Sequence, residues 1–97
     1  MFIQLIEGHT DDLDALNDLD KEWETAADDR HTVRRSIITT EHGDRTHFVV
    51  LAFFDSYESA MENSRLPETD AMAAKFASLV KDLGYRDLDV LDDRKMD

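Results

Sequence analysis

The sequence predicts an α+β fold in which strands and helices follow the order β-α-β-β-α-β, with the second helix broken. Three observations support this prediction. The apolar run over residues 47–54 has no polar alternation, which indicates a strand whose two faces both leave water. Apolar residues recur at helical spacing over residues 13–27 and again over residues 67–83. Turn residues around Gly43 and the only proline, Pro67, separate these segments.

The first part of the chain contains a short strand and an amphipathic helix. Residues 2–7 form the strand, which we expect to end at Gly8. Thr10 is in the position of a helix N-cap, and the aspartates after it suit the positive end of a helix dipole. The apolar stripe of the helix then extends to about Ala27, and its members are Leu13, Leu16, Leu19 and Trp23.

The middle of the chain predicts a β-hairpin followed by a short helix. Residues 32–40 are rich in β-branched side chains and precede turn residues 41–44, so they should pair with the apolar run. We expect Asp55 to cap a helix over residues 56–63, because Glu58 follows it in capping-box register.

The last part of the chain predicts a second long helix and a fourth strand. Pro67 fits the first position of the helix, because proline lacks the amide hydrogen that this position leaves unpaired. Gly84 is in the position of its C-cap. A strand over residues 85–91 and a frayed tail over residues 92–97 should follow. The helical stripe comprises Met72, Phe76, Leu79, Val80 and Leu83.

This order is the ferredoxin-like arrangement, a four-stranded antiparallel sheet with both helices on one face. We expect it to span residues 1–97 as one domain. Both alternating sets of residues 47–54 are apolar, so the face without helices would expose a patch that is unusual on a small monomer. A two-fold homodimer that pairs the sheet faces would cover this patch. The sequence therefore predicts a homodimeric α+β barrel.

Composition excludes several classes of partner. The 97 residues carry a net charge of −12, so the chain lacks the basic surface that nucleic acids and anionic membranes require. The absence of cysteine excludes disulfides and thiolate sites. No segment approaches membrane-spanning length and no basic leader precedes the first strand, so we expect a cytoplasmic protein.

Residues 54–68, FDSYESAMENSRLPE, resemble the stretch after the third strand in dimeric α+β barrel proteins of the antibiotic-biosynthesis-monooxygenase-like superfamily. In that superfamily an aromatic strand end leads into a short S-x-E-x-A helix, a break and a proline-led helix. Its members include cofactor-independent quinone-forming monooxygenases, haem-degrading enzymes and stress-response barrels. Many members have a histidine where this chain has Asn63, so the resemblance does not extend to haem binding or to a histidine-based mechanism.

Asn63 and Trp23 are the candidate catalytic residues. The amide of Asn63 could hydrogen-bond a phenol, quinone or enolate oxygen and stabilise negative charge on it, and a helix C-cap is the alternative role. Trp23 could stack on an aromatic substrate and donate its indole N–H, or it could close the first helix onto the sheet as a core residue.

The candidate ligand-binding residues are Phe53, Tyr57, Phe76 and His47. The three aromatic side chains belong to the core, and in this fold the core contains the pocket. His47 could act as a base near neutral pH if it points inward, or it could lie at the dimer rim. The histidines and carboxylates show no metal-ligand spacing, so the sequence predicts neither a metal nor a cofactor.

Three functions of different classes follow from these observations. The first is a barrel that binds a small hydrophobic or aromatic molecule between sheet and helices. The second is a cofactor-independent monooxygenase acting on a phenolic or polyketide-like substrate, so the sequence leaves open whether the protein is an enzyme. The third is a structural or regulatory dimer that docks a basic partner. The docking surface would then comprise Asp11, Asp12, Asp14, Asp18 and Asp20.

Overall fold

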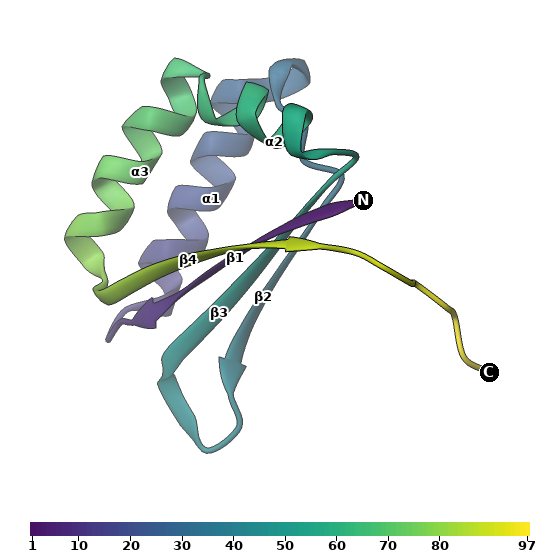
Figure 1. Cartoon of the computed structure of the whole chain (residues 1–97). Coiled ribbons are helices and arrows are strands. Elements are labelled where there is room, and N and C mark those ends of the chain that lie inside the picture. The colour runs from purple at the N-terminus through teal and green to yellow at the C-terminus, as the bar shows by residue number, and fades with distance from the viewer.

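The computed structural model describes residues 1–97 and has the predicted β-α-β-β-α-β order (Figure 1). Its four strands form an antiparallel sheet in the order β2-β3-β1-β4. The helices lie on one side of this sheet, so the predicted ferredoxin-like fold is confirmed. The strands are β1 (Phe2–His9), β2 (Arg35–Glu41), β3 (Asp44–Phe54) and β4 (Lys81–Asp89). The helices are α1 (Leu13–Ala27), the 3₁₀ turn η1 (Asp28–Arg30), α2 (Tyr57–Ser64) and α3 (Pro67–Leu79).

The two central strands, β1 and β3, pair along the whole length of β1, from Phe2 opposite Phe54 to His9 opposite His47. The side chains of β1 and β3 therefore lie in the middle of both faces of the sheet. The hairpin between β2 and β3 turns at Gly43, whose φ of 93° is a conformation that favours glycine.

Alternate residues of the strands point to opposite faces of the sheet. On the face toward the helices, Phe48 is fully buried and Phe54 is 2% exposed. The face without helices carries half-buried apolar side chains from three strands, which we call the open face. The open face comprises Ile3, Leu5, Ile37, Val49, Leu51 and Phe53.

The first helix begins later than the sequence predicts. Asp12 is its N-cap, since the Asp12 side chain accepts a hydrogen bond from the Ala15 amide at 3.0 Å. Thr10 lies outside the helix and accepts from the Asp12 amide at 3.1 Å. The predicted cap at Thr10 is wrong because β1 continues past Gly8 to His9, which shifts the start of the helix along the chain.

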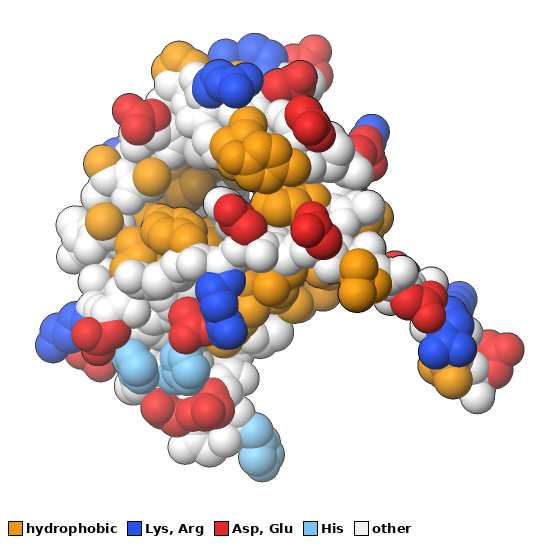
Figure 2. All heavy atoms as spheres, viewed as in Figure 1, with side chains coloured by type: hydrophobic (Ala, Val, Ile, Leu, Met, Phe, Trp, Pro, Cys, Tyr) orange, Lys and Arg blue, Asp and Glu red, His pale blue; other side chains and the backbone are white.

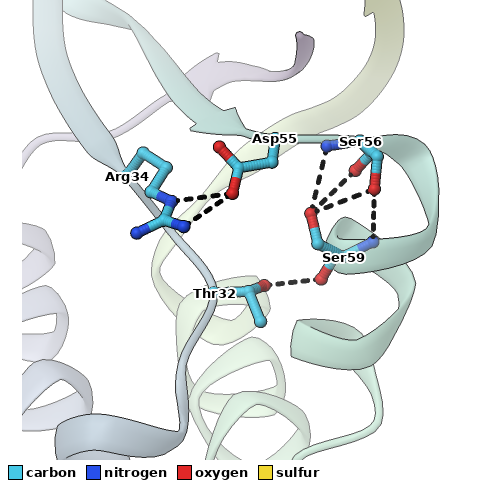
Figure 3. Close-up of polar contacts among 5 residues, drawn as sticks. All are labelled: Thr32, Arg34, Asp55, Ser56 and Ser59. Atoms are coloured by element: carbon cyan, nitrogen blue, oxygen red, sulfur yellow. Dashed lines mark hydrogen bonds and ion pairs between the residues drawn. The ribbon is translucent and has the colours of Figure 1, made fainter.

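The cap of α2 also differs from the prediction. Ser56 is the N-cap, and it forms a reciprocal capping box with Ser59 in which both hydrogen bonds are 3.1 Å long (Figure 3). Neither Asp55 nor Glu58 has the predicted role. Asp55 instead accepts two hydrogen bonds from the Arg34 guanidinium, at 2.6 and 3.0 Å (Figure 3).

The second long helix ends at Leu79, five residues before the predicted glycine cap. Gly84 lies inside β4, opposite Glu7. Apolar residues at helical spacing continue to Leu83, but the chain is already in β4 from Lys81. His9, the last residue of β1, pairs with Lys81 across a shift in register, and this strand pairing prevails over the helical pattern. Asp82, with a φ of 56°, provides the local backbone bend. After β4 the chain has no regular structure and leaves the body as an extended tail (Figure 1).

The helical layer contacts the sheet mainly at its two ends. At one end α2 packs on β1 and β3 around a core cluster of Phe2, Phe54 and Ala60. At the other end Phe76 of α3 makes an edge-to-face contact with Phe48, with ring centroids 5.7 Å apart. Between these ends α1 packs against α3, and a space remains between the helices and the sheet. None of the helices is long and apolar enough to cross a membrane.

Candidate functional site

A cleft of about 600 Å³ lies between the helix-facing side of the sheet and the helices. Figure 2 shows a hollow between the two layers with hydrophobic side chains inside it. The volume falls in the range that is typical of small-molecule sites. The strands contribute Gln4, Ile6, Ile38, Val50 and Ala52 to its lining, and the helices contribute Asn17, Asp20, Trp23, Asn63, Thr69 and Met72.

A smaller pocket of about 110 Å³ continues the cleft toward Phe48 and Phe76. Its lining is mostly apolar and includes Leu16 of α1 and Ala73 of α3. We call it the inner pocket. Of the four predicted ligand-binding residues, Phe76 is the one that lines this space.

Asn63 lies in the last turn of α2, where its side chain is buried in the cleft wall. Its Oδ1 atom accepts a hydrogen bond from the Thr32 amide at 3.4 Å. Because a backbone N–H can only donate, this contact orients the side-chain amide and leaves Nδ2 as the free donor. Arg65 is the C-cap of the helix, so Asn63 does not have the alternative capping role.

Trp23 lines the same cleft and is 8% exposed. Its indole Nε1 donates a hydrogen bond to Thr69 Oγ1 at 2.9 Å, which joins α1 to α3. In this structure the indole N–H is paired within the protein, so the Trp23 ring face is what it offers to the cleft. The ring of His31 tilts against the indole with centroids 5.1 Å apart.

The other predicted ligand-binding residues lie away from the cleft. Phe53 is on the open face, where the Arg35 guanidinium carbon lies 5.7 Å from its ring centroid. Tyr57 is 51% exposed. His47 is also on the open face and stacks on His9 with centroids 4.8 Å apart. Phe53 and His47 lie on the open face because the odd-numbered residues of β3 point away from the helices.

His31 and Asp20 are among the polar residues that line the cleft although the sequence did not assign them to the site. His31 follows η1 in an irregular segment, and its Nδ1 atom is buried without a hydrogen-bond partner. Asp20 lies on α1, and burial raises the pKa of its carboxyl, with Glu24 adding to the effect. No motif marks His31. Asp20, however, lies four residues after Leu16 and three before Trp23, so helical spacing could have placed it on the buried stripe.

The segment between η1 and β2 is held against α2 by polar contacts (Figure 3). Thr32 Oγ1 donates to the Ser59 carbonyl, and the Thr32 amide donates to Asn63. Two residues on, Arg34 binds Asp55, and its guanidinium holds the pKa of that carboxyl below its usual value. These contacts fix the cleft wall on which His31 and Asn63 lie.

The chain matches no protein-family model and no curated protein. Solved structures do match it over nearly its whole length. A candidate antibiotic biosynthesis monooxygenase from Deinococcus radiodurans has a TM-score of 0.78 at 14% identity, covering 99% of this chain and 98% of that one. SnoaB, a cofactor-independent oxygenase from Streptomyces nogalater solved as a mutant, has a TM-score of 0.80 at 9% identity, with coverages of 95% and 94%. Rv0793 from Mycobacterium tuberculosis has a TM-score of 0.73 at 17% identity, with coverages of 98% and 100%.

These likenesses establish the class of fold. The chain has the ferredoxin-like fold of antibiotic biosynthesis monooxygenases, which confirms the resemblance predicted from residues 54–68. At identities of 9–17% the likeness extends to the fold and not to a particular activity.

Proposed function

We propose that this protein binds a small, largely apolar aromatic molecule in the cleft between its sheet and its helices. The cleft itself is the observation that carries this proposal, because about 600 Å³ of space is left beside apolar strand residues in a chain of only 97 residues. A protein of this size that needed only stability would gain by filling such a space with side chains.

Asn63 is the proposed polar anchor for the ligand. Its Nδ2 group is a donor without a protein partner at the cleft wall, and its orientation is set by the Thr32 amide. A carbonyl or phenolic oxygen of the ligand would accept from Nδ2 while the aromatic body lies over Ile6, Val50 and the Trp23 ring.

A second candidate function is cofactor-independent oxygenation of a phenolic or polyketide-like substrate. It is supported by the likeness to SnoaB, which is described as a cofactor-independent oxygenase. In this mechanism Asn63 would stabilise the substrate anion, Trp23 would form the wall against which the ring lies, and the electron-rich substrate would itself react with dioxygen. The same cleft would serve both functions, so the two differ only in whether the bound molecule is turned over.

The proposed assembly is a homodimer through the open face. This face presents apolar side chains such as Leu5, Leu51 and Phe53 from adjacent strands, and a second copy would remove them from water. Docking of a basic partner on α1 has less support, because Asp20 is turned toward the cleft and leaves the proposed acidic surface.

The test of the proposed function is a titration with 1,4-naphthoquinone, an acceptor-only aromatic ligand. Trp23 is the only tryptophan and lines the cleft, so quenching of its fluorescence would report binding there. We expect saturable quenching, and we expect Asn63→Ala to weaken binding about tenfold through the loss of one hydrogen bond.

Glu62→Gln is the matched control, because Glu62 is an exposed neighbour on the same helix. It should bind like the wild type. An absence of saturable quenching by naphthoquinone and by related phenols would refute the proposal. Oxygen uptake in the presence of a bound phenol would distinguish the oxygenase from the non-catalytic binder.

A further inference from the structure

We infer that Asp20 is a second polar anchor in the cleft, which selects ligands that carry a hydroxyl group on their apolar body. The inference rests on the proposed function and deepens it, since it specifies the chemistry of the ligand. With Asn63 donating to one oxygen and Asp20 accepting from another, the preferred ligand is a hydroxylated aromatic ketone or quinone.

The position of Asp20 is the first observation. This residue lines both the main cleft and the inner pocket, so its carboxylate lies where the two spaces meet. Ile6, Val50 and Met72 line both spaces with it. A ligand whose apolar end reaches toward Phe76 would pass this carboxylate.

The second observation is that the fold makes no use of this carboxylate. Asp20 forms no side-chain hydrogen bond and no ion pair, whereas other acids such as Asp55 and Glu68 have arginine partners. A half-buried carboxylate without a partner is unfavourable, because it loses hydration and gains nothing in return.

The buried stripe of α1 also indicates that the fold does not need a carboxylate at Asp20. Leu16, Trp23 and Ala27 are the buried residues of the helix, and Asp20 falls between them at the spacing of one face. An apolar side chain at this position would extend the packing of that face. The raised pKa of Asp20, caused first by burial and then by Glu24, reflects the same unfavourable placement.

The chemistry of the surroundings favours a neutral hydroxyl group over an ammonium group as the partner. The inner pocket is mostly apolar, so a cation entering it would lose its hydration at high cost. A phenolic O–H satisfies the carboxylate with a short charge-assisted hydrogen bond and brings no charge of its own.

The experiment compares two probes that differ only in this donor, 1-naphthol and its methyl ether. We expect the wild-type protein to bind naphthol at least about tenfold more tightly than the ether, since one charge-assisted hydrogen bond is lost with the ether. Asp20→Leu should remove or reverse this preference and raise the unfolding midpoint in urea, because an unpaired carboxylate is replaced by an apolar side chain. Asp18→Leu, at an exposed position on the same helix, should leave the preference unchanged.

Each outcome supports or overturns the inference. If wild-type protein binds both probes equally, the cleft is a binding site but Asp20 does not select hydroxyl groups. If Asp20→Leu retains the preference for naphthol, another acceptor is responsible. If neither probe nor naphthoquinone binds, the proposed function fails and the inference fails with it. Should Asp20→Leu not fold, Asp20→Asn keeps the shape of the side chain and must reduce the preference, because it replaces a charge-assisted hydrogen bond with a neutral one.

Discussion

The two faces of the sheet are made by alternate residues of the same strands, yet they have different surroundings. On the helix face, Phe48 and Phe54 are completely or almost completely buried, and a cleft remains beside them. On the open face, Val49 and Leu51 are half-buried, as are Val50 and Ala52 of the helix face where they line the cleft. The environment of a β3 residue is therefore decided by what lies above it and not by its own hydrophobicity.

The polar groups are also distributed differently. On the helix face they line the cleft from both layers, with Asp20 and Asn63 on the helices and Gln4 and Ser36 on the strands. On the open face, the stacked pair of His9 and His47 lies at one end and Arg35 at the other. The apolar side chains between them are flanked by Thr39 of β2 and by the ion pair of Glu7 with Arg86 of β4. One face is thus suited to a small molecule with a few polar atoms, and the other is suited to a large apolar partner.

The largest expected effect comes from removing a side chain of the helix face. Phe48→Ala should lower the free energy of unfolding by about 3–5 kcal/mol, because Phe48 is fully buried and packs against Phe76. Leu51→Ala on the open face should cost about 1 kcal/mol or less in dilute protein, since Leu51 is only half-buried in the isolated chain.

Urea unfolding at low and high protein concentration measures both variants. Equal losses at low concentration would contradict the contrast between the faces. A cost of Leu51→Ala that grows with protein concentration would sharpen it, because the open face would then be covered by a second copy.

The next effect concerns the proposed dimer. Leu51→Asp places a charge at the centre of the open face and should weaken self-association more than about a hundredfold, since the carboxylate would be buried without a partner. Sedimentation equilibrium measures this change. Ala74→Asp, on the exposed side of α3, adds the same charge and should leave association intact. Wild-type protein that stays monomeric at all concentrations would disprove the dimer.

The sequence predicts the order of the elements but not the end of α3. The element order follows from periodicity and from Gly43 and Pro67, because these signals are local. The end of α3 was predicted wrongly because it depends on a distant contact. His9, at the end of β1, pairs with Lys81. Because of this pairing, a segment whose apolar residues have helical spacing becomes part of β4.

The sequence identifies some of the residues that line the cleft and misplaces others. Asn63 and Trp23 lie on the same cleft, since helix ends and stripes set their positions. Phe53 and His47 do not, because a strand that is apolar on both faces gives no signal of which set faces the helices. Asp20 was grouped with other acids by composition, although its spacing from Leu16 and Trp23 marks the buried stripe.

The smallest effect is expected at the exposed pair of Arg34 and Asp55, which joins the residue before β2 to the residue after β3 (Figure 3). The hydrogen bond from Arg34 lowers the pKa of Asp55 below its usual 3.8, so the pair stabilises the fold above that value. This contribution is lost as the pH falls through the lowered pKa, because both folded and unfolded chains then carry a protonated Asp55.

Asp55→Asn should therefore lower the urea midpoint slightly near neutral pH, and the difference from wild type should shrink toward about pH 3 or below. Asp92→Asn is the matched control, because Asp92 also contacts an arginine, Arg94, but lies in the tail beyond β4. Asp92→Asn should leave the urea midpoint unchanged both near neutral pH and at low pH. A difference for Asp55→Asn that stays constant with pH would show that the contact acts by shape alone. This end of the β2–β3 hairpin would then be held by the Ser56–Ser59 capping box and by the pairing of β2 with β3.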